Sequence, residues 1–187
     1  MTGVQTCALP ILIEETAEIG MATESLANYP ELVTLPCYEW QHVLVLPKNH
    51  PLAGVKQITL ERLHEHPLVT YHPSFTGRSR IDQAFAHQGL TPQIALEAID
   101  SDVIKTYVSL GMGVGVVAEM AVQDGLPDQL ISRPAGQLFG TNTARVAFKR
   151  GSYLRHFVLE FAQMLSNRLS RDLVLKALEG RHTDYEL

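Results

Sequence analysis

A short polar segment, Ser74-Phe-Thr-Gly-Arg-Ser79, leads into a stretch with helical spacing and carries side chains suited to holding a small ligand. A helix N-terminus presents unpaired backbone N–H groups and a partial positive charge. Thr76 and Ser79 add hydroxyl donors there. Gly77 lets the backbone approach a ligand closely, and Arg78 adds a fixed positive charge. The sequence therefore predicts a site for a small oxyanion such as sulfate or a carboxylate.

The same segment also has a simpler interpretation, an ordinary capping turn with Arg78 at the surface. Composition alone favours this interpretation, because Ser and Thr are common helix N-caps. Trp40, the only tryptophan, is open to two interpretations as well. It lines a cleft if the chain crosses between two lobes there, and otherwise it belongs to the core, as large aromatic side chains mostly do.

Motifs for catalysis, metals and nucleotides lack the context that they need. Gly113-Val-Gly-Val-Val-Ala118 fits G-x-G-x-x-A, but its glycines follow a helix and lie in an apolar strand, which predicts close helix–strand packing instead. The eight histidines include no H-E-x-x-H spacing, and no G-x-S-x-G occurs. We therefore predict that the chain is not an enzyme and holds no metal or cofactor.

Composition narrows the class of protein. The chain has 187 residues, 45% hydrophobic, which suffices for one sizeable core or two small lobes. Its net charge of -5 and its lack of a basic run predict weak DNA binding or none. No apolar stretch approaches the ~18 residues of a membrane span, and the first residues make a poor signal peptide. Cys7 and Cys37 are interpreted as free thiols in a reducing cytoplasm, so we predict a cytoplasmic protein without a membrane partner.

The chain from Trp40 to Val117 alternates strand and helix patterns, which predicts an α/β fold with parallel strands and right-handed crossovers. Strands are expected at 43–46, 67–71, 94–97 and 113–117, and helices at 60–64 (capped by Thr59), 78–87 and 101–110. Outside this region we expect strands at 18–23 and 145–149 and helices at 153–168 and 170–179. The first of these two helices has Leu154, Phe157, Val158, Phe161, Met164 and Leu165 on its apolar face.

Several segments resemble the effector domain of LysR-type transcription regulators. They are Leu35-Pro-Cys-Tyr-Glu-Trp40, His50-Pro-Leu-Ala53, Ile58-Thr-Leu-Glu-Arg-Leu63, His66-Pro-Leu-Val-Thr-Tyr71 and Gly111-Met-Gly-Val-Gly-Val116. Phe75-Thr-Gly-Arg-Ser79 and Asp102-Val-Ile-Lys-Thr-Tyr107 narrow the resemblance to the CysB/Cbl group, over about residues 18 to 180.

The resemblance implies a two-lobed α/β fold of the type II periplasmic-binding-protein kind. Residues 40–141 would form lobe II, and residues 12–39 with 142–187 would form a partial lobe I, with residues 1–11 set aside as a non-native leader. The effector would lie between the lobes, where Trp40 and Thr76 match positions that line the cleft.

The resemblance also implies a function. The chain would sense sulfate, thiosulfate or acetylserine for a transcription factor of cysteine biosynthesis and sulfur assimilation genes. DNA would be bound only through an N-terminal helix-turn-helix domain absent from this chain, and the full-length regulator would be a homo-oligomer. Two alternatives stay open, an exported solute-binding protein with the same lobes and an α/β enzyme that uses a nucleotide. A secretory signal encoded upstream would favour the first, and retention on a nucleotide-dye column with release by NAD the second.

Overall fold

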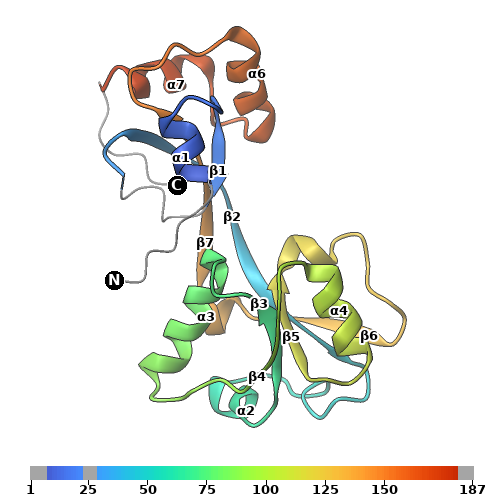
Figure 1. The fold of residues 1–187 in the computed structure, drawn as a ribbon. Coiled ribbons are helices and arrows are strands. Elements are labelled where there is room, and N and C mark those ends of the chain that lie inside the picture. The colour runs from blue at the N-terminus through green and yellow to red at the C-terminus, as the bar shows by residue number, and fades with distance from the viewer. Residues whose placement is uncertain (1–7, 23–28, 181–187) are drawn as a thin grey trace. The chain divides into compact units, whose positions relative to one another are not determined.

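The computed structural model describes residues 8–22 and 29–180. The chain forms two compact units (Figure 1). One, here the central unit, is Trp40–Thr141, and the other, here the terminal unit, comprises the described parts of Met1–Glu39 and Asn142–Leu187. No helix in the described ranges is long and apolar enough to cross a membrane.

The central unit is built on a sheet with the strand order β6-β2-β5-β3-β4. β3 (Leu68–Tyr71), β4 (Ile94–Ala98) and β5 (Val114–Ala118) run parallel to one another, and β5 is antiparallel to β2 (Leu32–Pro47). The predicted parallel pairing is thus confirmed for β3, β4 and β5, with bounds within a residue. It is wrong for the strand predicted at 43–46, which belongs to β2 and pairs antiparallel with β5. β6 (Leu130–Pro134) was not predicted. Only Leu130 and Ile131 in it are strongly apolar, and the prolines and glycines around them indicated a loop.

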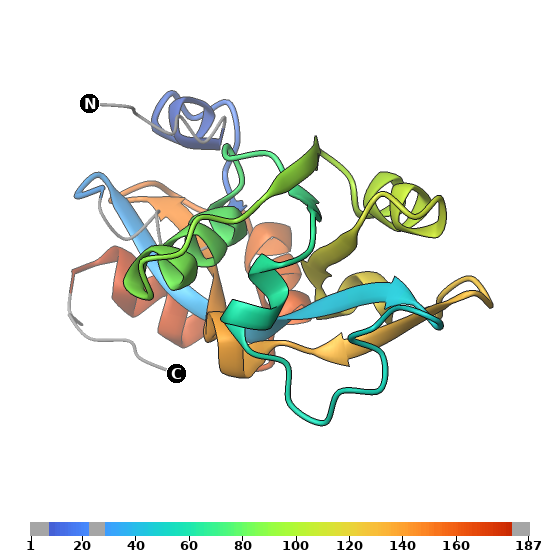
Figure 2. The ribbon, with the colours of Figure 1, turned by 90° about the horizontal axis from the view of Figure 1, so that it is seen from below.

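Helices cover both faces of this sheet, α3 (Thr76–His87) on one face and α4 (Ser101–Ser109) on the other (Figure 1 and Figure 2). Successive strand residues point to opposite faces, so β2 supplies Leu44 to the α3 side and Val45 to the α4 side. This explains why its apolar run is continuous rather than alternating. The shorter helical elements of the unit are α2 (Leu60–His64), η2 (Glu119–Val122) and α5 (Gly136–Phe139).

The glycines of the G-x-G-x-x-A segment serve packing, as predicted. A Cβ atom on Gly115 would lie 2.9 Å from Cγ2 of Val108 and 3.2 Å from Cγ2 of Ile104, so α4 approaches β5 as closely as a glycine allows. Gly113 precedes β5, and a Cβ atom there would lie 2.1 Å from the carbonyl oxygen of Pro67. Neither glycine forms a strand-to-helix turn of the dinucleotide-binding kind.

The terminal unit contains a small sheet, in which β1 (Gly20–Ala22) pairs antiparallel with β7 (Thr141–Lys149) and β7 lies next to β2. α6 (His156–Leu165) and α7 (Arg171–Leu178) pack on it and supply further core residues. The prediction for the apolar face of α6 is partly wrong. Val158, Leu159 and Ala162 are buried, whereas Phe157, Phe161 and Met164 are 55%, 48% and 84% exposed.

The segment before Trp40 holds more structure than the sequence predicted. β2 begins at Leu32, not at residue 43. Residues 8–11, which we set aside as a leader, belong to α1 (Ala8–Ile13), and Leu12 of this helix is fully buried against Leu32 and Ala147. Cys37 is a buried free thiol, and burial raises its pKa, whereas Cys7 lies outside the described residues.

Candidate functional site

The candidate site lies at one edge of the central sheet, where the parallel strands end. The loops after β3 and β4 lead into the N-termini of α3 and α4. β2 runs antiparallel to β5 and sets His42 opposite Ala118, the last residue of β5, so Trp40 also reaches this edge. In open α/β sheets, ligands bind outside the carboxyl ends of the strands.

Trp40 and the first turn of α3 are in contact. Trp40 and His42 are two residues apart on β2 and therefore share a face, with ring centroids 5.0 Å apart in an edge-to-face arrangement. A Cβ atom on Gly77 would lie 3.0 Å from Cη2 of Trp40 and 3.2 Å from Nε2 of His42. The bare backbone of Gly77 thus lets α3 begin directly on these two rings. The backbone of Thr76 opens the helix, while its side chain lies outside the described part of the structure.

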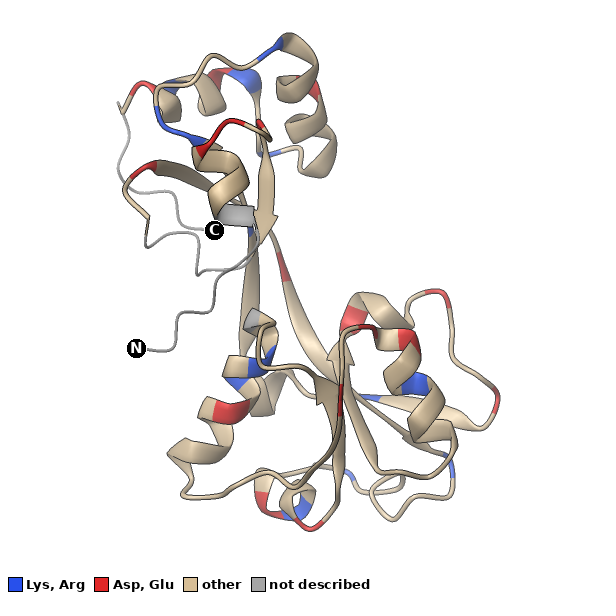
Figure 3. Cartoon of the chain, in the orientation of Figure 1, with Lys and Arg blue, Asp and Glu red and all other residues tan. Residues whose placement is uncertain are grey.

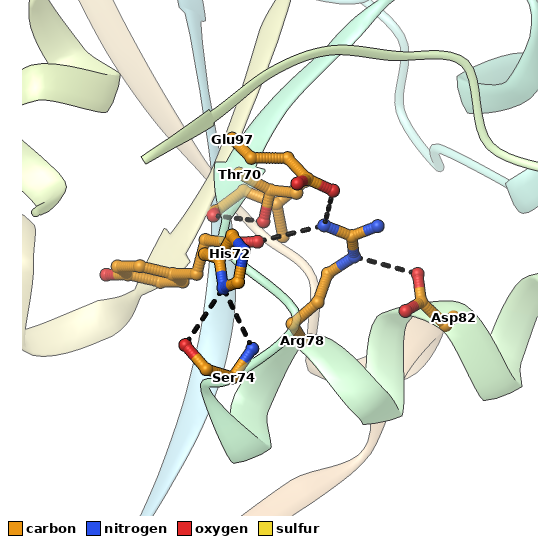
Figure 4. Close-up of polar contacts among 8 residues, drawn as sticks. Thr70, His72, Ser74, Arg78, Asp82 and Glu97 are labelled. Atoms are coloured by element: carbon orange, nitrogen blue, oxygen red, sulfur yellow. Dashed lines mark hydrogen bonds and ion pairs between the residues drawn. The ribbon is translucent and has the colours of Figure 1, made fainter. Parts of the chain in front are cut away.

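The two helix N-termini at this edge differ in how they are capped. Asp100 caps α4 with its own carboxylate, which accepts from two backbone N–H groups of the first turn at 2.6 and 3.4 Å. The N-cap of α3 is Phe75, whose side chain has no acceptor, and the Ser74 hydroxyl instead lies 2.9 Å from Nδ1 of His72 (Figure 4). The simpler capping-turn interpretation is therefore wrong for α3, because no Ser or Thr side chain takes the N-cap position.

Arg78 is held within the unit. It is 6% exposed, and its Nε donates to Asp82 at 2.8 Å (Figure 4). Its Nη1 donates to Glu97 at 2.8 Å and to the carbonyl of Tyr71 at 2.9 Å. Burial alone would lower the pKa of this guanidinium, but the hydrogen bonds that it donates to the two carboxylates outweigh burial and raise it. The fixed charge predicted at this position thus fastens the start of α3 to β3 and β4. Ser79 follows on the same turn and is exposed.

Sequence reasoning missed His42, which is fully buried between Trp40, Gly77 and Phe139. Burial, together with the positive charge of Arg80, lowers its pKa to about 4, against a smaller opposing effect of a hydrogen bond with the Gly77 backbone. The ring is therefore neutral at pH 7. Its place two residues after the lone tryptophan on a strand was the signal available in the sequence.

Further polar groups at this edge also went unpredicted. The backbone N–H of Gln41 donates to Oε1 of Glu119 at 3.0 Å, and Nε2 of Gln41 donates to the Thr141 hydroxyl at 3.2 Å. The Tyr71 hydroxyl accepts from the backbone N–H of Ala118 at 3.4 Å, and burial raises its pKa. Within the described ranges, His, Cys, Asp and Glu side chains form no group of three or more that could hold a metal ion.

A family model described as the LysR substrate binding domain matches residues 3–170. The chain belongs to this family. The match runs through most of the stretch 1–11 that we set aside as a leader. The sequence resemblance to LysR-type effector domains is thereby confirmed.

Two relatives in this family are transcription regulators. The HTH-type transcriptional regulator CysB of Burkholderia cenocepacia is 46% identical over 187 residues, which are 100% of this chain and 60% of that protein. The HTH-type transcriptional regulator cbl of Escherichia coli strain K12 is 42% identical over 174 residues, 91% of this chain and 55% of that protein. The chain thus spans 60% or less of the length of these two LysR-family relatives.

Solved structures agree with the family. The crystal structure of the cofactor-binding domain of the Cbl transcriptional regulator matches with a TM-score of 0.86 and 41% identity, over 96% of this chain and 79% of that one. The regulatory domain of CcmR from Synechocystis, solved with 2-PG, matches with a TM-score of 0.73 and 19% identity, over 87% of this chain and 78% of that one. At this identity the match shows a shared fold and nothing further. The predicted α/β fold of LysR-type effector domains, with its resemblance to periplasmic binding proteins, is confirmed.

Proposed function

We propose that this chain is the effector-sensing part of a CysB-like transcription regulator and that it binds a small acid at the start of α3. The proposed effector is sulfate, thiosulfate or acetylserine, and the regulated genes are those of cysteine biosynthesis and sulfur assimilation. The relatives CysB and Cbl, at 46% and 42% identity, support this assignment. The chain performs no catalysis in this proposal.

The contact between Trp40 and Gly77 carries the proposal. It places the indole ring beside the first turn of α3. The backbone N–H groups of that turn receive no capping hydrogen bond from the side chain of Phe75, the N-cap residue. The hydroxyls of Thr76 and Ser79 would add donors on the same turn, and Gly77 and Arg78 would hold that turn in place. A small anion at such a helix start gains both hydrogen bonds and the favourable end of the helix dipole.

The charges around this site favour recognition by dipoles over recognition by a free cation. Arg78 is paired with Asp82 and Glu97, and His42 is neutral at pH 7. Hydroxyl and amide donors distinguish ligands by shape and acceptor placement, so we infer selectivity among small acids of similar charge. Affinity at such a site should fall only modestly with salt.

The other expected partners remain part of this proposal. Lys and Arg are interspersed with Asp and Glu in both units (Figure 3), and the net charge is -5, so we assign DNA contacts to regions of the whole regulator outside these residues. The two relatives named above are HTH-type regulators, which supports this assignment and a cytoplasmic location. We expect the whole regulator to be a homo-oligomer.

Fluorescence of the single tryptophan tests the proposal directly. Titration with sulfate, thiosulfate or acetylserine should change Trp40 emission saturably for at least one of the three, because the ring lies against the binding turn. Thr76→Ala should weaken that response, since the hydroxyl donor is lost. Thr106→Ala is the matched control: Thr106 lies in α4, is exposed, and donates to the Asp102 carbonyl of its own helix.

Two results would overturn the proposal. One is an unchanged emission with all three acids, together with no heat in a calorimetric titration of the same samples. The other is equal loss of affinity in Thr76→Ala and Thr106→Ala, because a site at the start of α3 cannot depend on a distant hydroxyl in this way.

A further inference from the structure

One pocket of the central unit has a basic lining. Its volume is about 430 Å³, and it is formed by Lys56, Gln57, Ile58, Arg133, Pro134 and Gln137. None of these residues belongs to the candidate effector site. Lys56 to Ile58 come from the loop before α2, Arg133 and Pro134 from β6, and Gln137 from α5. The volume falls within the range of small-molecule sites.

Arg133 is the structural centre of this pocket. Its Nη1 donates to the carbonyl of Ala53 at 2.5 Å, and its Nη2 donates to the carbonyls of Val55 at 2.6 Å and Lys56 at 3.4 Å. All of these acceptors are neutral backbone groups of one loop. Arg78 differs, because two carboxylates meet its charge. These hydrogen bonds thus fix the guanidinium of Arg133 in position, but none of their acceptors is negatively charged.

The rest of the lining adds donors without adding negative charge. Lys56 contributes a second cation, and Gln57 and Gln137 contribute side-chain amides. Ile58, 3% exposed, and Pro134 supply the apolar part. Among residues 8–22 and 29–180, no Asp or Glu lines the pocket, although acidic residues outnumber Lys and Arg in the chain, 20 to 15. A cation pair without acids attracts small anions, and a fixed guanidinium is suited to oxyanion geometry.

We propose that this pocket binds a small, doubly charged oxyanion of the phosphate class, with Arg133 and Lys56 facing its charge. A guanidinium has five N–H donors, and the loop carbonyls use only part of them. The ligand would neutralise the Arg133 charge and so hold the loop of residues 53–57 more firmly against β6. This inference does not depend on the proposed effector site.

Inorganic phosphate is the probe, added to the ¹⁵N-labelled chain while NaCl is lowered to keep the ionic strength constant. Backbone amide signals of Lys56, Gln57 and Arg133 should shift saturably. Lys56→Glu should raise the Kd about tenfold, the effect expected for losing one charge-assisted contact. Lys48→Glu, a reversal of another exposed loop lysine that does not line the pocket, should leave the Kd within about twofold, because its charge is screened by solvent.

Gln137→Ala is a second variant, which removes a donor and keeps the net charge. It should also weaken phosphate binding while amide dispersion stays intact. Three results would overturn the proposal: no saturable shift at these amides, equal weakening by Lys56→Glu and Lys48→Glu, or unchanged binding in both Lys56→Glu and Gln137→Ala. Thr76→Ala separates the two sites. It should weaken the Trp40 emission response to the effector and leave the phosphate-induced amide shifts unchanged.

Discussion

The indole of Trp40 stands where a side chain of residue 77 would have to go, since a Cβ atom on Gly77 would lie 3.0 Å from its Cη2 atom. Glycine at this position therefore does more than permit a turn. It sets the distance between β2 and α3, and with it the position of the N–H groups that open the helix. Small changes at residue 77 should consequently alter both stability and ligand binding.

Gly77→Ala should lower the free energy of unfolding by about 1–3 kcal/mol, the usual cost of forcing a methyl group into packed surroundings. It should also weaken effector binding, because the first turn of α3 must move away from Trp40. Urea unfolding and a Trp40 fluorescence titration measure the two effects. Gly54→Ala is the control, since a Cβ atom on Gly54 meets nothing within 4 Å. Equal effects in the two variants would contradict the argument.

Phe75→Asp should separate folding from binding. A carboxylate at the N-cap of α3 would accept hydrogen bonds from the backbone N–H groups of the first turn. Such a cap stabilises a helix by about 1 kcal/mol. The same carboxylate would occupy and repel the proposed anion position, so affinity should fall at least tenfold while the melting temperature holds or rises.

Phe75→Asn caps the same helix without a charge, and it should retain more affinity than Phe75→Asp. If Phe75→Asp binds the effector as well as the unchanged chain does, the anion is not at this helix start.

His42 should make stability depend on pH. Its pKa is about 4 in the folded chain, below the ordinary value of 6.5 that applies when the chain unfolds. The neutral ring is thus favoured by folding, so this contribution is fully present above pH 6.5 and is lost as the pH falls from 6.5 towards 4. The lost free energy is about 3 kcal/mol, from the size of the pKa difference.

Urea unfolding at a series of pH values measures this loss. His42→Gln should flatten the slope of the unfolding free energy against pH between pH 6.5 and 4. His87→Gln, at an exposed position of α3, should leave that slope unchanged. Equal slopes for all three proteins would show that the pKa of His42 is the same in the folded and the unfolded chain.

Arg78→Lys should destabilise the central unit by about 1–2 kcal/mol. A lysine ammonium cannot reach Asp82, Glu97 and the Tyr71 carbonyl together as the planar guanidinium does. The figure lies below that for a fully buried pair, because both carboxylates are partly exposed. Arg62→Lys, in the exposed face of α2, is the control for the unfolding measurement.

Glu97→Gln in combination with Arg78→Lys completes a double-mutant cycle. The two changes should be less than additive, because each removes the same contact. Full additivity would mean that Arg78 and Glu97 act independently.

The sequence by itself determined the features that depend on neighbours along the chain. Apolar runs and their breaks located β3, β4 and β5, and the order of strands and helices implied parallel pairing. Thr59 caps α2 as predicted, its hydroxyl accepting from the backbone N–H of Arg62 at 3.4 Å. Such features follow from backbone hydrogen bonding and side-chain periodicity, both of which are local.

Only the tertiary structure decided which side chains meet. Strand register placed Trp40 and His42 against Gly77, and the packing of α3 on the sheet brought Arg78 to Glu97 of β4. It also chose which apolar residues of α6 are buried, because the apolar face of this helix is wider than the part that packs on the core. The reason is physical: contacts between distant segments depend on register and packing distance, and residue types alone do not encode these.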